Sequence, residues 1–296
     1  MPPSRKALLQ IHFCVVIWGF TAILGKLISL PAFALVWWRM FLVVLVLAFV
    51  PAFWRGLRQM SLRTLGIFAG IGVVVALHWV SFYAAIKLAN ASVAATCMGV
   101  APIIMAVIEP WITRKRFDPR ELLIGVAAIP GVMLVVGGTP HGMRLGIVVG
   151  ILSAFLVAVF GSLNKRYVEA GEPLAVTGLE LAAGTAFLTV LALAFGGEAL
   201  RLPVPDGHDA VLLLVLSIGC TLLPFALSLV ALRKLSAFSA QLAVSLEPVY
   251  AVVLAMLLLG EQRELGLQFY AGLVIILGSV FAHAALQRTG SSASAR

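Results

Sequence analysis

Three ionisable residues interrupt otherwise apolar stretches of the chain: Arg39, Glu180 and Glu247. Ionisable groups in hydrocarbon are costly, so they typically face an interior cavity or a partner. Glu247 stands directly before Pro248, which lacks a backbone N–H and favours a kink. A carboxylate beside a kink could bind a substrate amine or carry a proton. The alternative is a structural role, with Arg39 and Glu180 as ionic contacts between helices and Glu247 paired with Arg39.

Aromatic and small polar residues recur at helical spacing in the same stretches, as in Trp79 and Tyr83 or Trp18 and Thr21. Aromatic faces stack on flat apolar groups, while hydroxyls and amides orient polar ends, so such walls suit an amphipathic small molecule. The structural alternative is that small residues let helices approach and aromatics fill gaps. The predicted substrate-binding residues are Trp18, Thr21, His78, Trp79, Tyr83, Thr96, Gly99, Ser153, Phe160, Asn164, Glu247 and Tyr250.

Catalytic and metal signatures are weak. His78 could titrate near neutral pH, or it could simply be hydrogen-bonded. Ser81 near His78 is the only candidate for a Ser–His dyad, there is no HExxH, and no Asp lies deep within a predicted span. The three cysteines share no CxxC spacing, so neither a disulfide framework nor a metal site is indicated. A GxxxxGK[ST] loop is absent, so ATP hydrolysis within this chain is not expected.

The composition indicates which elements hold these residues. Of the 296 residues, 62% are hydrophobic and only 11% charged, with a mean hydropathy of +1.09. Soluble domains are about half apolar and about a quarter charged. The chain therefore has too little polar material for a soluble enzyme, a disordered protein or an ordinary nucleic-acid binder. We expect an all-α integral membrane protein.

A membrane-spanning helix needs about 20 mostly apolar residues. The segments are continuously apolar rather than alternating, which argues against a membrane β-barrel. Ten spans are predicted, at Ala7–Leu27, Phe33–Phe53, Thr64–Ile86, Ala91–Ile112, Glu121–Gly137, Leu145–Tyr167, Leu174–Phe195, Asp209–Leu232, Ser239–Leu259 and Leu267–Leu286.

The basic residues orient these spans. With both termini on the cytoplasmic side, fifteen of the 21 Lys and Arg residues lie inside, five lie outside, and Arg39 lies within a span. Such an excess is the usual bias of cytoplasmic loops, so the net charge of +9 needs no nucleic acid to explain it. We expect a multi-pass protein of a bacterial-type inner membrane.

The two halves of the chain resemble each other. Because each half would hold five spans, an odd number, the repeats would enter the membrane in opposite senses. Inverted repeats are typical of transporters, since two related halves can rock about a central site. We expect repeats at 1–140 and 141–288 and a disordered tail at 289–296. At an offset of 147 residues, the matches include Ser81 with Ser228, Lys87 with Lys234, Ser92 with Ser239, Gly125 with Gly272, and Gly131 with Gly278.

Nearly the whole chain resembles the drug/metabolite transporter superfamily, EamA type. The stretch 246–261, LEPVYAVVLAMLLLGE, is similar to that family's Pro-centred penultimate span ending in Gly-Glu, and Val100-Ala-Pro-Ile-Ile-Met-Ala matches it in the first half. Trp18-Gly19-Phe20 and the later Lys26 are similar to the family's opening. The chain departs from the family at 114–116, where Arg-Lys-Arg replaces an expected acidic residue. Within the superfamily it looks most like the aromatic amino acid and metabolite exporters.

The resemblance implies a secondary transporter that exports small amphipathic solutes, most of all aromatic or neutral amino acids or related metabolites, by alternating access. Pro102 and Pro248 are candidate hinges. The expected partners are a small-molecule substrate and the lipid bilayer, with no nucleic acid, cofactor or metal and no enzymatic activity. Ten spans can enclose a cavity in one chain, so a monomer is plausible. A lipid or nucleotide-sugar mover of the same fold and an intramembrane enzyme are the alternatives.

Overall fold

The computed structural model describes residues 5–114, 119–167, 169–224, 227, 231, 243–244 and 246–293, and within these ranges every regular element is a helix. Short turns η1 (His141–Met143), η2 (Glu198–Leu200) and η4 (Glu261–Arg263) link longer helices, and the π-helical η3 (Val215–Leu222) follows α10 directly. The longer helices are α1 (Arg5–Leu27), α2 (Ala32–Ala48), α3 (Pro51–Gln59), α4 (Leu62–Leu88), α5 (Ala91–Met98), α6 (Ala101–Thr113), α7 (Pro119–Gly137), α8 (Arg144–Tyr167), α9 (Pro173–Phe195), α10 (Gly207–Leu214), α13 (Glu247–Leu259) and α14 (Leu267–Ala293).

Five helical segments in the described ranges are long and apolar enough to cross a membrane: α1, α4, α5 with α6, η1 with α8, and α9. The bent pair α2–α3 would make a sixth, and three shorter apolar helices include α13. The predicted eighth and ninth spans run partly through residues outside the described ranges. The predicted count of ten spans therefore stays a prediction.

The second predicted span, Phe33–Phe53, is wrong at its end. Helix α2 stops at Ala48, and α3 starts at Pro51 after a bend of 92°. Proline cannot continue the preceding helix, but it fits the first position of a new one. Helix α3 is amphipathic, with Phe53 and Gly56 buried. At the other end of the chain, α14 continues to Ala293, past its predicted end and into the predicted disordered tail.

Prolines also begin two helices near the middle of the bundle. Helix α5 ends at Met98, and α6 begins at Ala101 with Pro102 in its first turn. Helix α13 begins at Glu247 with Pro248 in its first turn. In the described part of the chain both prolines stand in the first turn of a helix, where their missing N–H groups leave no intrahelical bond unmade. Their predicted role as hinges stays a prediction.

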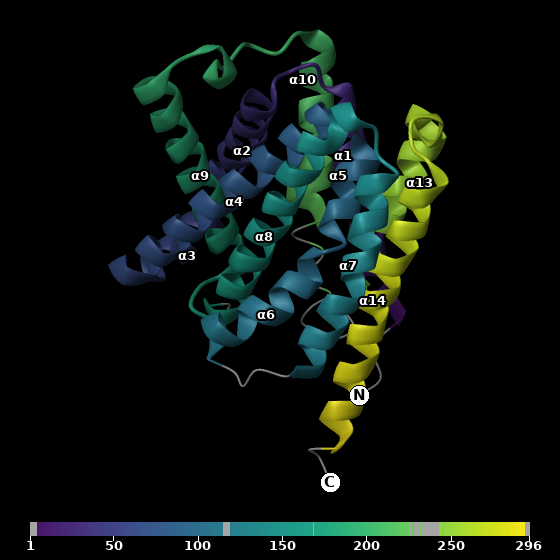
Figure 1. Cartoon of the computed structure of the whole chain (residues 1–296). Helices are drawn as coiled ribbons and strands as arrows, with labels where there is room; N and C mark the ends of the chain where they lie inside the picture. The colour runs from purple at the N-terminus through teal and green to yellow at the C-terminus, as the bar shows by residue number, and fades with distance from the viewer. Residues whose placement is uncertain are drawn as a thin grey trace.

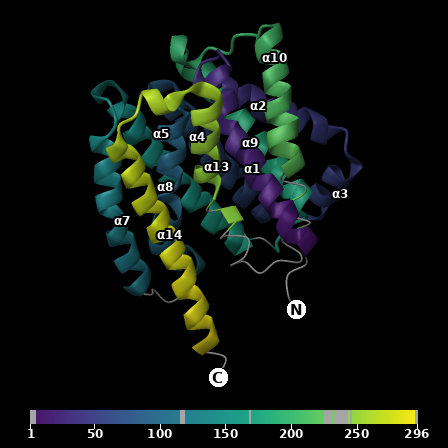
Figure 2. The same cartoon turned by 90° about the vertical axis from the view of Figure 1, so that its right-hand side faces the viewer.

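The helices form one bundle whose chain ends lie together. Figures 1 and 2 place the start of α1 and the end of α14 at the same end of the bundle, with α10 at the opposite end. In the same two views α7 and α14 lie side by side. Gly131 of α7 and Gly272 of α14 meet there: a Cβ added to Gly272 would lie 2.4 Å from the Gly131 carbonyl oxygen. Small residues of this kind let membrane helices approach closely.

Helix α4 lies against both α8 and α9 and approaches α9 at a glycine. A Cβ added to Gly72 would lie 2.1 Å from the carbonyl oxygen of Glu180. We therefore expect Gly72→Ala to lower the free energy of unfolding by about 1–3 kcal/mol, the usual cost of overpacking. Thermal unfolding in detergent measures this change. The matched control is Gly66→Ala on the same helix, where a Cβ meets nothing within 4 Å. Equal unfolding midpoints for the two variants would contradict this packing.

Candidate functional site

A small pocket lies between α1, α4, α5 and α13. We call it the central pocket. Its volume of about 10 Å³ leaves room for roughly one water molecule. Helices α1, α4 and α5 belong to the first predicted repeat, and α13 belongs to the second, so the pocket lies between the two. Of the predicted binding residues, the structure brings Trp18, Thr21 and Glu247 together here. The lining residues are Trp18, Thr21, Ala22, Phe82, Ala95, Met98, Glu247, Pro248 and Ala251.

Glu247 is the one ionisable residue that lines the central pocket in the described part of the chain. It is the first residue of α13, where the helix N-terminus favours negative charge. Among the described residues its carboxylate has no hydrogen bond and no direct ion pair. Arg39, predicted as its structural partner, attracts it only from a distance and forms no direct contact. The nearby hydroxyl of Thr21 donates to the carbonyl oxygen of Trp18 at 2.6 Å. Glu247 is therefore available to a ligand or a proton.

Arg39 of α2 is held behind the pocket, with 4% of its surface exposed. Its Nη1 donates to the Tyr83 hydroxyl at 2.7 Å, and its Nε donates to Thr221 Oγ1 at 2.8 Å. Its guanidinium carbon lies 3.9 Å from the centre of the Trp79 ring, a cation–π contact. Trp79 and Tyr83 are predicted to bind substrate, and in this structure both contact the Arg39 side chain. The Tyr83 ring in turn packs edge-on against Phe82 of the central pocket, with ring centres 5.4 Å apart.

His78, Ser153 and Phe160 form a separate buried cluster between α4 and α8. His78 Nδ1 lies 2.9 Å from both the carbonyl oxygen and the hydroxyl of Ser153, and the Phe160 ring centre lies 5.4 Å from the imidazole. The Ser81 hydroxyl donates to the carbonyl oxygens of Leu77 and His78. The Ser81–His78 dyad that an intramembrane enzyme would need is therefore not formed.

The remaining predicted residues lie outside the central pocket. Thr96 donates to the Ser92 carbonyl oxygen and lines a second cavity of about 10 Å³, otherwise apolar apart from Cys97. Gly99 packs against Ile276, and Tyr250 packs against Gly19 of α1. Asn164 donates to Glu180, and this pair also stands apart from the central pocket. Glu180, predicted as an ionic contact, has no ion pair among the described residues.

The sequence reasoning missed a contact between the two repeats at the α10 end of the bundle. Glu261, which is 1% exposed, accepts hydrogen bonds from the backbone N–H groups of Ala91 at 2.9 Å and Ser92 at 2.7 Å. These are the first two residues of α5, whose N-cap Asn90 donates to Glu264 at 3.0 Å. A carboxylate at a helix N-terminus is stabilised by the free N–H groups and the helix dipole. The sequence signal that could have indicated this contact is the Gly-Glu pair that ends the motif at 246–261.

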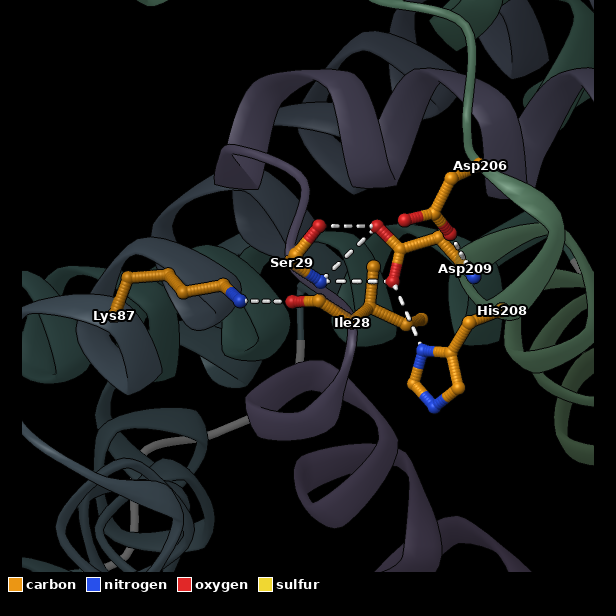
Figure 3. A network of polar contacts seen from close by, with 6 residues as sticks. All are labelled: Ile28, Ser29, Lys87, Asp206, His208 and Asp209. Carbon is orange, nitrogen blue, oxygen red and sulfur yellow. Dashed lines mark hydrogen bonds and ion pairs between the residues drawn. The ribbon is translucent and has the colours of Figure 1, made fainter.

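A second missed contact ties the α1–α2 connection to α10 (Figure 3). The Asp209 carboxylate accepts from the Ser29 backbone N–H at 2.9 and 3.1 Å and from the Ser29 hydroxyl at 2.6 Å. Lys87 donates to the carbonyl oxygen of Ile28 next to it. Asp206 and His208 lie close to Asp209, but Asp206 caps α10 and Ser29 already occupies both Asp209 oxygens. The cluster therefore acts as a tether between helices.

The Glu261 contact predicts a stability effect. In Glu261→Gln, an amide NH2 must face one of the two α5 N–H groups, and a buried donor left without an acceptor costs about 1–3 kcal/mol. We expect the thermal midpoint in detergent to fall accordingly. The control is Glu169→Gln, an exposed glutamate outside this contact, which should change the midpoint much less. If both variants match the wild type, Glu261 does not hold α5.

Fold and site together define a multi-pass helical membrane protein with a mostly apolar pocket, which holds one carboxylate, between its two predicted repeats. The chain belongs to the EamA-like transporter family, which matches residues 5–137 and again residues 144–284. It is 23% identical over 200 residues to the "Uncharacterized transporter YyaM" of Bacillus subtilis (strain 168), across 62% of this chain and 66% of that protein, just under two thirds of its length. A solved crystal structure has the same fold, with a TM-score of 0.63 at 17% identity over 96% of this chain and 98% of the other.

Proposed function

We propose that this protein is a secondary transporter that exports small amphipathic organic solutes by alternating access. Aromatic or neutral amino acids and related metabolites are the proposed substrate class. The proposed location is a bacterial-type inner membrane, with both chain ends in the cytoplasm. Membership of the EamA-like transporter family supports transport of a small solute. The substrate class and the export direction rest on the resemblance to the aromatic amino acid and metabolite exporters, and the pocket residues support an amphipathic solute.

The observation that carries the proposal is the carboxylate of Glu247, which has no hydrogen bond or direct ion pair among the described residues and lies in a pocket between the repeats. A substrate ammonium group would bind this carboxylate through a charge-assisted hydrogen bond. Trp18 and Phe82 supply flat apolar walls for a side chain. A pocket with mostly apolar walls and one or two placed polar groups is the usual architecture of a small-molecule site.

The contacts at the two ends of the bundle support a cycle in which the end that carries both termini, the proposed cytoplasmic end, opens first. The central pocket holds about one water molecule, so a solute can enter only after the helices move apart. At the α10 end, the buried Glu261 and Asp209 contacts hold the helices together. At the end that carries both termini, α6 and α8 are joined by the Lys165–Glu109 pair at 2.6 Å, in which the Lys165 side chain is 48% exposed. The Glu109 side chain is 17% exposed, and Arg166 of α8 also donates to the carbonyl oxygen of Ile112 on α6. Contacts that water reaches contribute less than fully buried ones, so we propose that this end separates more easily.

Purified protein in liposomes tests the proposal. We expect uptake or counterflow of at least one labelled solute from a panel of aromatic amino acids, neutral amino acids and related metabolites, above the rate of empty liposomes. The matched control is the Glu247→Gln protein at the same density, which should transport that solute much more slowly. Failure to move every solute of the panel, with folded protein in the membrane, would contradict the proposal. Transport of labelled lipid or of a nucleotide sugar alone would assign the fold to those substrates instead.

A further inference from the structure

Away from the central pocket, Glu180 of α9 and Asn164 of α8 form a buried polar pair. Glu180 is 7% exposed, and Asn164 Nδ2 donates to its Oε2 at 3.4 Å. The other oxygen of each group, Glu180 Oε1 and Asn164 Oδ1, is buried with no hydrogen-bond partner in the described part of the chain. Unsatisfied buried polar atoms are uncommon and call for an explanation. Here two of them belong to the two groups that already touch.

The chemistry of the pair points to a missing proton. An ionised carboxylate and an amide oxygen both only accept hydrogen bonds, so Glu180 Oε1 and Asn164 Oδ1 cannot satisfy each other. One proton on Oε1 converts that oxygen into a donor. The acid and the amide can then bond in both directions, from Nδ2–H to Oε2 and from Oε1–H to Oδ1. A single proton gives a hydrogen-bond partner to both oxygens, Glu180 Oε1 and Asn164 Oδ1, whereas a metal cation would need several more oxygen ligands.

No described charged group ion-pairs with Glu180. Helix α4 contacts the backbone of Glu180 at Gly72, a residue that carries no charged group. On α2, Arg39 is engaged by Tyr83 and Thr221, and His78 of α4 is engaged by Ser153. On α6, which packs against α8, Glu109 is 17% exposed and is paired with Lys165. The other charged groups on the surrounding helices lie at exposed positions or near helix ends: Arg55 and Arg58 on α3, Arg63 and Lys87 on α4, Arg144, Lys165 and Arg166 on α8, and Glu172 at the start of α9.

We propose that Glu180, with Asn164 as its partner, is a proton-binding site that couples solute movement to the proton gradient. This inference rests on the proposed transport function. In the described conformation the carboxyl carries a proton on Oε1. When α8 and α9 move apart and water replaces Asn164, that proton leaves to the solution on the open side, and a proton from the other side takes its place in the next cycle. Each cycle thus carries one proton, with no other reactant.

Infrared difference spectroscopy of the protein in lipid tests the site without any solute. Over a titration from about pH 3 to about pH 9, which brackets ordinary and strongly shifted carboxyl groups, we expect a protonated-carboxyl C=O band that persists near neutral pH. The band should be absent in Glu180→Gln and shifted in frequency in Asn164→Ala. The matched control, Glu172→Gln at an exposed position preceding the same helix, should leave it in place. The amide introduced by Glu180→Gln supplies an N–H in place of the O–H of the protonated acid, so this variant keeps the pairing and the fold.

The same spectra contain the outcome that overturns the proposal. If the band is unchanged in Glu180→Gln, the proton is elsewhere, and Glu247→Gln shows whether the central pocket holds it. If added Na⁺ removes the band at constant pH, the pair binds a metal cation instead of a dedicated proton.

Flux in liposomes separates this inference from the proposed function. With an imposed pH gradient we expect solute flux to change in the wild type, and the gradient to have no effect on flux in Glu180→Gln. If no solute moves in either protein while the infrared band behaves as described, the transport function fails and the proton site stands. If solute moves in both proteins and the gradient affects both equally, the proton site is wrong and the transport function stands.

Discussion

Replacing Glu247 by Gln is expected to reduce transport by about 10- to 100-fold while the protein folds normally. A charge-assisted hydrogen bond contributes about 1.5–3 kcal/mol, and each 1.4 kcal/mol is a factor of about ten. Because the Glu247 carboxylate has no hydrogen bond or direct ion pair among the described residues, the neutral amide breaks no described hydrogen bond and gives up only the distant attraction to Arg39. The loss therefore falls on the solute or on a bound proton. Initial rates and half-saturation concentrations in liposomes measure it.

The control for this variant is Glu198→Gln. Glu198 is exposed at the start of η2, far along the chain from the central pocket, and its contact with Arg201 is loose at 3.9 Å. We expect its transport rate to equal that of the wild type. If Glu247→Gln instead aggregates or unfolds at a lower temperature, the carboxylate is structural. Unchanged transport would remove Glu247 from the binding site.

Replacing Arg39 by Ala is expected to lower the free energy of unfolding by about 3 kcal/mol or more, a larger loss than for Gly72→Ala or Glu261→Gln. The variant loses two charge-assisted hydrogen bonds and a cation–π contact, each contributing about 1.5–3 kcal/mol, and regains part of the cost of burying a charge. It also leaves the buried hydroxyls of Tyr83 and Thr221 with fewer partners. Thermal unfolding in detergent measures the effect.

Two further variants make this result interpretable. Arg39→Lys keeps the charge but cannot form the planar fork that reaches Tyr83 and Thr221 together, so an intermediate midpoint is expected. Arg201→Ala removes an exposed arginine from the η2 connection and should leave the midpoint unchanged. A wild-type midpoint for Arg39→Ala would show that the buried cation adds no net stability.

The long apolar helices could be predicted from the sequence because their hydrophobic runs alone decide where they begin and end. Helix α4 extends its predicted span by two residues at each end, and α8 and α9 differ from theirs by a single residue at the N-terminal end. The bend at Pro51 was harder to predict, because the apolar run continues through it to Phe53 and hydropathy does not record a missing N–H. A proline near the end of an apolar run is therefore a better sign of where the helix stops than composition is.

The site was predictable in its residue types but less so in its pairings. Trp18, Thr21 and Glu247 do meet in the central pocket, since polar and ionisable residues in membrane helices usually face a cavity. The partners of Arg39 come from α4 and from the π-helical turn after α10, a separation of 182 residues for Thr221. Contacts of that kind depend on how helices pack, and a single sequence contains no direct signal for them.

Labelling of one engineered thiol from each side of the membrane tests the central claim, a pocket that opens in turn to both faces. Thr21→Cys places the thiol in the central pocket, in a background where the native Cys14, Cys97 and Cys220 are replaced. We predict that a membrane-impermeant maleimide labels it both in intact cells and in inverted vesicles. Labelling from one face only, with and without transported solute, would contradict alternating access.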